Sequence, residues 1–390
     1  MIHIENKKDC AGCSACANIC PKNCIKMERD ETGFSYPAID TDVCIGCGRC
    51  ETVCPIINPA KKNNPLSVVG AKNRDESVRS SSSSGGTFYE LAKMVVSRGG
   101  IVYGCALDSE LVARHIGVET LDELSALKGS KYVQSDIGTT YREVKSALMD
   151  GREVLYSGTP CQIAGLKNYL GREYDTLLLV DVLCHGVPSP GVFADYLGYL
   201  TDKFGSKPVS VNFRNKEKSW KRLYFEVEFE NGKRYFTFCG YDRYMSMFLN
   251  NISLRPSCYD CHFTTTNRQG DITLGDFWGI GRKYPERDDD KGISLIIVNS
   301  EKGARAYSEI ADGLSGFDSE IETALAGQQT LSSPTKKNPK HDDFYRLYSD
   351  KGLKTAIESV TEIPTAPKRA YYAVMRWGLD LVRKILKKGY

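Results

Sequence analysis

The sequence has no long apolar run and little net charge. No segment approaches the ~18 consecutive apolar residues that a membrane-spanning helix requires. The opening residues, MIHIENKKDC, contain none of the apolar core that is typical of a secretory signal peptide. The formal net charge is +3, too small to indicate a nucleic-acid partner. We therefore expect a cytoplasmic protein that does not bind nucleic acid.

Cysteine, in contrast, is abundant, with fifteen residues in a chain of 390. Two copies of the pattern C-x2-C-x2-C-x3-C occur, each followed directly by proline. The first copy is Cys10, Cys13, Cys16 and Cys20, and the second is Cys44, Cys47, Cys50 and Cys54. Bacterial ferredoxins use this run to hold two [4Fe–4S] clusters. Such thiols must stay reduced, which also favours a reducing compartment.

The spacing further predicts how the two blocks share their clusters. Three cysteines of a block surround one cluster, while the fourth points away and binds the other cluster. One cluster should therefore be held by Cys10, Cys13, Cys16 and Cys54, and the other by Cys44, Cys47, Cys50 and Cys20. The alternative is a pair of zinc knuckles, since C-x2-C pairs also bind zinc. Zinc would require only four cysteines and no proline, so we favour the clusters.

The chain divides into four parts. Residues 1–60 form the predicted ferredoxin module, and the polar, helix-breaking residues 61–66 are expected to be a linker. Residues 67–340 alternate short apolar runs with amphipathic stretches, which predicts an α/β domain with a mixed sheet. Residues 341–390 are expected to be a helical tail. The predicted fold class is thus multidomain: an α+β ferredoxin module, a mixed-sheet α/β domain and the tail.

Hydrophobic periodicity predicts individual elements within the long second domain. The first half should contain strands over 67–71, 101–107, 153–156 and 176–183, and helices over 87–97, 141–148 and 162–170. The second half should contain an antiparallel hairpin that turns at Asn231-Gly232, strands over 271–274 and 293–299, and a helix over 301–310. The pattern of residues 311–340 is ambiguous.

Four further cysteines occupy loop positions in this domain. Cys161 follows one predicted strand, Cys184 ends another, and Cys258 and Cys261 form a C-x2-C pair. The carboxyl ends of parallel strands meet at one edge of a sheet, so Cys161 and Cys184 can lie together. The four thiols would suit another iron–sulfur cluster. Alternatively, Cys161 and Cys184 are small buried residues and the C-x2-C pair binds zinc, with His262 or His185 as a further ligand.

A serine- and glycine-rich run, Ser80–Gly86, precedes the helix predicted over 87–97. Such a run can be only a flexible linker. At the start of a helix, however, it exposes backbone N–H groups that bind phosphate. Gly129–Tyr132 could supply a second such turn, with Lys131 pairing with the phosphate.

Several spaced segments resemble the coenzyme F-420 hydrogenase/dehydrogenase beta-subunit family. They are SSSGGTF, GSKYVQS, GTPCQ, LCHG, NFRNK, the C-x2-C pair and DITLGDFWGI, and together they span about residues 67–300. The added ferredoxin module looks most like soluble reduced-F-420 dehydrogenase subunits. The resemblance implies that the α/β domain is flavin-binding and holds FAD. The residues near FAD would be Ser83, Ser84, Gly85, Gly86, Thr87, Lys131, Gly158, Thr159 and Pro160. The resemblance also implies a third [4Fe–4S] cluster on Cys161, Cys184, Cys258 and Cys261.

These features together predict an iron–sulfur flavoprotein oxidoreductase. Its substrate would be a two-electron small molecule, either deazaflavin F-420 or an unknown compound, and a redox protein is a second candidate partner. His185 is the candidate catalytic residue, as a proton relay, because it adjoins Cys184 and histidine titrates near neutrality. Two alternatives are a flavin-free electron-transfer adapter and a scaffold organised by zinc.

The end of the sequence is strongly basic. Residues 366–390 contain seven basic side chains and one acidic side chain. In a helix, the apolar and basic residues would lie on opposite faces, which is typical of helices that contact anionic membranes. Alternatively, this helix could dock on the protein's own domain or on an acidic partner. Three other thiols, Cys24, Cys105 and Cys239, lack cluster spacing and are interpreted as small core or surface residues.

Overall fold

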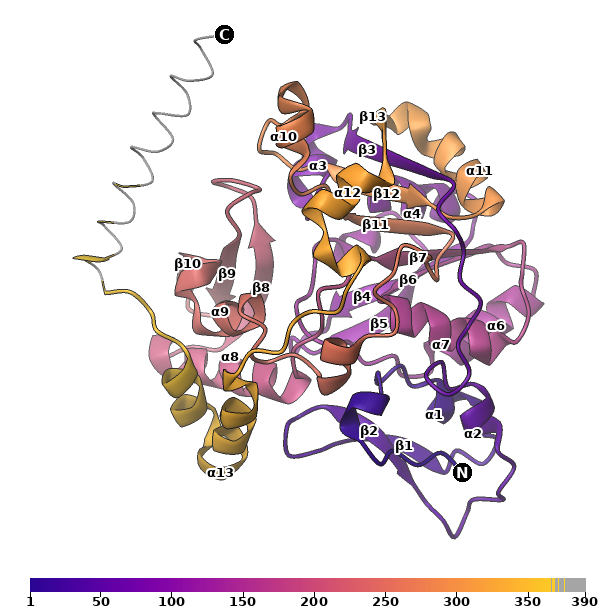
Figure 1. The fold of residues 1–390 in the computed structure, drawn as a ribbon, viewed down its shortest axis with the longest axis horizontal. Helices are drawn as coiled ribbons and strands as arrows, with labels where there is room; N and C mark the ends of the chain where they lie inside the picture. The colour runs from indigo at the N-terminus through magenta and orange to yellow at the C-terminus, as the bar shows by residue number, and fades with distance from the viewer. Residues whose placement is uncertain (366, 369–370, 372–374, 376–390) are drawn as a thin grey trace.

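Three β-sheets organise residues 1–365, 367–368, 371 and 375, which are the residues that the computed structural model describes. The predicted amphipathic helix of residues 366–390 lies almost entirely outside them. Within the described residues, no helix combines the length and the hydropathy of a membrane span. Figure 1 shows the sheets as separate units, with the N-terminal one below the large central sheet.

The N-terminal domain contains a two-stranded antiparallel sheet and two short helices. Its elements are α1 (Ala15–Ile19), β1 (Ile25–Arg29), β2 (Ser35–Ile39) and α2 (Arg49–Thr52). Each cysteine block begins as a tight loop, has its third cysteine in one of these helices and has its fourth cysteine just after that helix. Gly12 and Gly46, inside the loops, have φ values of +68° and +66°. Glycine adopts this left-handed backbone without a steric penalty, so the loops can close.

The central sheet has eight strands in the order β13-β3-β12-β11-β7-β6-β4-β5. Their bounds are β3 (Ser67–Asn73), β4 (Ile101–Leu107), β5 (Ala113–Val118), β6 (Val154–Gly158), β7 (Leu177–Val182), β11 (Ile272–Asp276), β12 (Ser294–Val298) and β13 (Leu314–Ser319). The middle strands β4, β6, β7 and β11 are parallel neighbours, whereas the outer pairings are antiparallel. The sheet is mixed, as the sequence predicts.

Helices cover both faces of this sheet. The helices are α3 (Glu76–Ser81), α4 (Thr87–Ser97), α5 (Leu124–Leu127), α6 (Thr140–Met149), α7 (Pro160–Leu170), α10 (Ile280–Lys283), α11 (Glu301–Ile310) and α12 (Ile321–Gly327). One core joins α4 and α11 to the sheet, and a second core joins α6 and α7 to it. Because strands β6 and β7 are buried between these layers, their sequences are almost continuously apolar.

A separate three-stranded antiparallel sheet, in the order β10-β9-β8, lies beside the central sheet. Its strands are β8 (Pro208–Asn215), β9 (Tyr224–Phe229) and β10 (Arg234–Phe238), and its helices are α8 (Pro190–Phe204), α9 (Arg243–Leu249) and α13 (Lys340–Val360). Aromatic side chains dominate the core of this unit, including Phe193, Phe213 and Phe225. The predicted hairpin at Asn231-Gly232 therefore belongs to this smaller sheet, and not to the central one.

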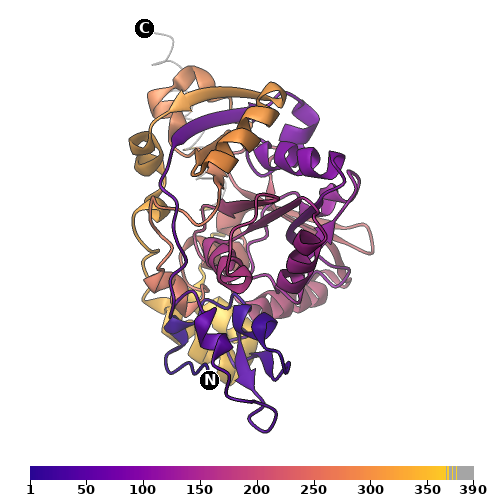
Figure 2. The same ribbon diagram turned by 90° about the vertical axis from the view of Figure 1, so that its right-hand side faces the viewer.

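The N-terminal domain is fastened to both of the larger units, and Figure 2 shows it at their lower end. Arg142 on α6 donates to the backbone carbonyl of Asn18 at 2.7 Å. Ser189, which caps α8, donates to the carbonyl of Thr32 at 2.7 Å. On α7, a Cβ added to Gly165 would lie 2.9 Å from the Cys13 sulfur. The absence of a side chain at Gly165 thus lets the first cysteine loop rest directly on α7.

Candidate functional site

The two cysteine blocks of the N-terminal domain exchange their last members. Cys20 lines one pocket together with Cys44, Cys47 and Cys50. Burial, together with the nearby thiols of Cys10 and Cys54, raises the pKa of Cys16 to about 12. Cys54 is therefore close to the first block, and Cys20 is close to the second. This is the exchange that the spacing predicts for two [4Fe–4S] clusters.

A fifth cysteine, Cys24, lies in the second of these groups. Its side chain is buried, lines the same pocket and places its sulfur 3.3 Å from the sulfur of Cys20. The sequence interpretation of Cys24 as an ordinary core or surface residue missed this position. Three residues separate Cys24 from Cys20, a spacing that matches no ligand pattern. The proximity of Cys24 to the second cysteine group is therefore visible only in the folded structure.

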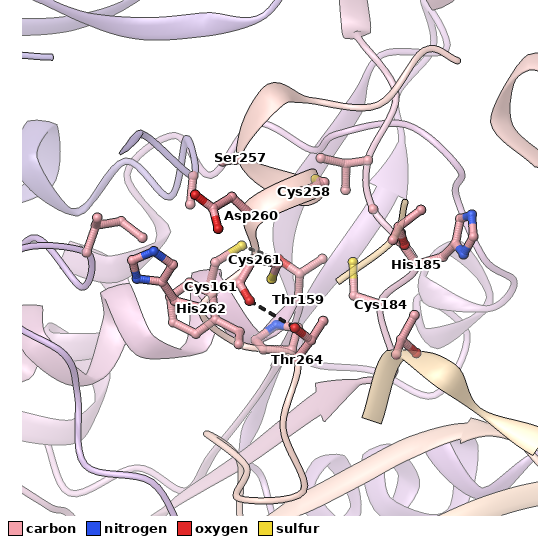
Figure 3. Close-up of a pocket in the computed structure, with 18 of the residues that line it drawn as sticks. Thr159, Cys161, Cys184, His185, Ser257, Cys258, Asp260, Cys261, His262 and Thr264 are labelled. Carbon is pink, nitrogen blue, oxygen red and sulfur yellow. Dashed lines mark hydrogen bonds between the residues drawn. The ribbon is translucent and has the colours of Figure 1, made fainter. Parts of the chain in front are cut away.

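A second cysteine group lies at the carboxyl ends of two central strands. Cys161 is in the first turn of α7, directly after β6, and Cys184 follows β7. Cys258 and Cys261 come from a short turn over Pro256–Asp260 and the residue after it. The four cysteines line a single pocket, which we call the cysteine pocket, and Figure 3 shows them around the same space. The structure thus brings together all four cysteines that the sequence singles out.

Local structure explains this convergence. Strands β6 and β7 are parallel neighbours, so the residues that follow them leave the sheet at one edge. Thr159 and Gln162 form a capping box that begins α7 and fixes the turn before Cys161. The segment carrying the C-x2-C pair is held by Arg255, whose backbone N–H donates to the carbonyl of Val187 at 2.9 Å.

The cysteine pocket is a poor environment for free thiolates. Burial raises the pKa of Cys161 to about 11 and that of Cys258 to about 12, and it raises the pKa of Cys184 well above its usual value. Buried thiolates therefore need bound cationic metal, and four cysteines are the donor set of a [4Fe–4S] cluster. In the residues that the structure describes, no three His, Cys, Asp or Glu side chains form a group that could hold a single metal ion.

A second, larger pocket lies between the serine-rich run and the small sheet; we call it the basic pocket. It is lined by Ser80–Ser83, the turn Gly129–Lys131 and the strand segment 211–217. Six basic side chains line it, against three acidic ones: Arg79, Lys128, Lys131, Arg214, Lys216 and Lys291 against Glu76, Glu217 and Asp290. Three of the sequence segments that carry the family resemblance thus meet at one electropositive surface.

Arg214 is the most informative residue of the basic pocket. It is 5% exposed and forms an ion pair with Asp276 through one terminal nitrogen. Its Nε and Nη2 groups are buried and have no hydrogen-bond partner among the described residues. Unpaired buried donors cost about 1–3 kcal/mol each unless a ligand accepts from them. An anion such as a phosphate would satisfy both groups.

The predicted FAD-contacting residues do not all lie at this pocket. Ser83 and Lys131 line it, and the Ser83 hydroxyl accepts from the backbone N–H of Ser130 at 2.6 Å. Lys131 is largely committed to its own loop, because its ammonium donates to the carbonyls of Ala126 and Lys128. Burial lowers the pKa of Lys131 to about 8.

The rest of the serine- and glycine-rich run serves the fold. The Ser84 hydroxyl donates to the carbonyl of Ile293, and the Gly85 N–H donates to the hydroxyl of Ser294 at 3.0 Å. Gly86, at φ +91°, begins α4, and Thr87 is buried behind it. These residues anchor the run to strand β12 and leave its earlier serines to line the basic pocket.

The segment Gly158–Pro160 lies elsewhere. Thr159 and Pro160 line the cysteine pocket, and Gly158 ends strand β6 directly before them. None of these three residues lines the basic pocket. Of the nine residues that the resemblance assigns to FAD, two line the basic pocket, two line the cysteine pocket, and the other five line neither.

His185 lines the cysteine pocket, but its imidazole is directed away from the sulfurs, as Figure 3 shows. Its Nε2 atom is 2.7 Å from the side-chain oxygen of Asn251, and its ring packs edge-on against Phe248. Burial lowers the pKa of His185, so the ring is neutral near pH 7. His262, the other histidine considered for zinc, also lines the pocket.

Comparisons with known proteins agree with the two cysteine groups. Residues 9–56 match the model of the 4Fe–4S dicluster domain. Residues 151–315 match the model of the carboxyl-terminal part of the coenzyme F-420 hydrogenase/dehydrogenase beta subunit. A comparison with curated proteins finds no match.

Among solved structures, the chain is similar to a chain of the F-420-reducing [NiFe] hydrogenase complex from Methanosarcina barkeri. The sequence identity is 16% and the TM-score is 0.45, over 77% of this chain and 92% of that chain. The two family matches include all eight cysteines of the N-terminal blocks and all four of the cysteine pocket. Residues 151–315 are thus similar to the carboxyl-terminal part of the coenzyme F-420 hydrogenase/dehydrogenase beta subunit, and residues 9–56 are similar to a 4Fe–4S dicluster domain.

Proposed function

We propose that this protein is an iron–sulfur flavoprotein oxidoreductase that exchanges electrons with a two-electron small-molecule substrate. One observation carries the proposal. Cys161, Cys184, Cys258 and Cys261 line a pocket that is also lined by Lys8, Ala11 and Ile56 of the dicluster domain. A metal group in that pocket would lie beside the first cysteine loop, which is the arrangement that a chain of one-electron carriers requires.

Helix α7 links the two metal-binding regions directly. Cys161 occupies its first turn, and Gly165, one turn later, contacts Cys13. The four cysteines of the pocket would hold a third [4Fe–4S] cluster, and the dicluster domain would hold the other two. The protein itself would exclude water from the cysteine sulfurs and keep the distance between the cysteine pocket and the dicluster domain constant.

The basic pocket is the proposed site of FAD. Ser83 and Arg214 would hold its pyrophosphate, because the pocket is electropositive and Arg214 has two unsatisfied donors. Lys216 would add positive charge only, since its ammonium already donates to the carbonyls of Arg79, Ser84 and Lys291. When bound, FAD would supply the exchange between two-electron and one-electron chemistry. Thr159 and Pro160 would face the cysteine pocket in this arrangement. The role of His185 in moving a proton remains a proposal, as do F-420 as the substrate and a redox protein as a partner.

Iron content tests the third cluster. The full-length protein, purified without oxygen, should contain about twelve irons per chain, and the double variant Cys258→Ala/Cys261→Ala should contain about eight. Alanine removes two thiolates from the cysteine pocket and leaves the dicluster domain intact. Iron and protein are measured together on the same samples.

Cys105→Ala is the matched control, because Cys105 is a partly buried thiol that lines neither cysteine group. It should retain the full iron content. A wild-type value of about eight irons would refute the third cluster and leave the two-cluster adapter. The full chain is preferable to a deletion of residues 1–60, since that deletion would uncover buried contacts such as Gly165.

Flavin content tests the basic pocket. Arg214→Gln should weaken FAD binding by about tenfold or more, because one charge-assisted hydrogen bond contributes about 1.5–3 kcal/mol. Arg214→Lys should restore part of the occupancy, since it keeps the charge. Lys221 is an exposed lysine that is paired with Asp288, so Lys221→Gln should leave the flavin content unchanged. The readout is flavin released per chain, with iron as the internal reference. Equal flavin content in all four proteins would place the cofactor elsewhere.

A further inference from the structure

Arg255 is fully buried at the junction between the dicluster domain and the cysteine pocket. Its guanidinium donates to the carbonyl of Cys10 at 2.7 Å, to the carbonyl of Ser35 at 3.0 Å and to the side-chain oxygen of Gln134 at 3.0 Å. It also donates to the sulfur of Cys10 at 3.5 Å. The Cζ atom of Arg255 lies over the ring of Tyr36, 4.2 Å from the ring centroid.

These partners are all uncharged. Among the residues that the structure describes, no carboxylate lies within 4.0 Å of Arg255. Arg268 is also buried, but it has a counter-ion, because its guanidinium is 3.1 Å from the carboxylate of Asp181. A buried arginine without a counter-ion is costly, because desolvation of the charge is not offset by a nearby opposite charge.

The charge of Arg255 is close to both metal-binding regions. Cys10, which it contacts, is a predicted ligand in the dicluster domain. Cys258, three residues along the chain, belongs to the cysteine pocket. Burial dominates the raised pKa values of Cys161 and Cys258, and Arg255 acts on both thiols in the opposite direction. The backbone of the first cysteine loop also rests on this side chain, since a Cβ at Gly12 would be 2.9 Å from its Cζ atom.

We propose that Arg255 is the shared counter-ion of two [4Fe–4S] clusters, the one held by Cys10, Cys13, Cys16 and Cys54 and the one held in the cysteine pocket. A cluster bound by four thiolates is an anion, and reduction makes it more negative. A fixed positive charge therefore stabilises the reduced form, and net charge and hydrogen bonds to sulfur are recognised controls of cluster potential. Arg255 is a positioning residue here, and the inference rests on the proposed function in assuming that both clusters are present.

Reduction potentials of the full-length holoprotein test the proposal. In Arg255→Gln, the two clusters beside Arg255 should become harder to reduce, with the ratio of reduced to oxidised cluster at a given potential falling about tenfold, or ~59 mV for one electron. The cluster held by Cys44, Cys47, Cys50 and Cys20 is the internal reference and should keep its potential. Electron paramagnetic resonance at poised potentials follows the clusters separately.

Two further variants complete the design. Arg255→Lys keeps the charge and should keep both potentials near the wild-type values. Arg98→Gln removes a surface charge that pairs with Glu309 and Glu153, so it should shift no cluster. If Arg255→Gln loses both adjacent clusters while Arg255→Lys retains them, the counter-ion role also stands.

Two results would overturn the proposal. In the first, Arg255→Gln retains three clusters with unshifted potentials. In the second, Arg255→Lys behaves like Arg255→Gln, which would show that the shape of the guanidinium matters and its charge does not. Failure of the proposed function is distinguishable, because it would appear as about eight irons in the wild-type protein before any substitution is made.

Discussion

Replacing Cys20 and Cys24 together by alanine should remove about four irons from the protein, whereas Cys20→Ala alone should remove few of them. The predicted fourth ligand of the cluster formed with Cys44, Cys47 and Cys50 is Cys20. When it is absent, Cys24 is the nearest replacement, because its sulfur is 3.3 Å from that of Cys20 and lines the same pocket. Iron content and the spin count of the reduced protein measure the loss.

Cys24→Ala alone is the matched control and should keep all its iron, since Cys20 remains in place. Complete loss of this cluster in the single Cys20→Ala variant would show that Cys24 cannot act as a ligand. Loss of the other dicluster cluster in Cys20→Ala would contradict the exchange of cysteines between the blocks.

Gly85→Asp should prevent normal folding. A Cβ at this position would lie 2.2 Å from the carbonyl oxygen of Ala71 and 2.6 Å from the nitrogen of Ser294. The added carboxylate would also be buried without a partner. Overpacking and an unpaired buried charge together should lower the free energy of unfolding by at least about 3 kcal/mol. The yield of soluble protein and its thermal midpoint report the effect.

Ser80→Asp separates this steric effect from electrostatic repulsion in the basic pocket. Ser80 is exposed and lines that pocket, so the variant should fold normally and lose flavin only. A Gly85→Asp protein of normal stability would mean that strands β3 and β12 can separate around the run, contrary to the packing described above.

The apolar patterns of the sequence predicted the central sheet well. Strands such as 176–183 are buried on both faces and cannot be mistaken for loops, and the structure confirms a strand at Leu177–Val182. The helices at 87–97 and 301–310 are confirmed with the same bounds. The proximity of Cys161 and Cys184 was also predictable, because each follows one of two parallel strands whose carboxyl ends lie at the same edge of the sheet.

Elements with mixed polarity were missed. Strand β13 (Leu314–Ser319) has only one buried residue. Strand β8 (Pro208–Asn215) contains the buried Arg214, whose ion-pair partner Asp276 is sixty-two positions away. The composition of the run Ser80–Gly86 is typical of phosphate-binding loops, yet its two glycines pack closely against strands β3 and β12. Arg255 carries no local signal, since its partners Cys10 and Gln134 come from distant parts of the chain.

The contact between Gly165 and Cys13 has a kinetic consequence. Many electron carriers sit on tethers and must diffuse to their donor before each transfer. Here the dicluster domain is seated on α7, held by Arg142 on one side and by Ser189 on the other. Transfer between the cysteine pocket and this domain would therefore need no swinging motion, so its rate should be insensitive to the viscosity of the medium.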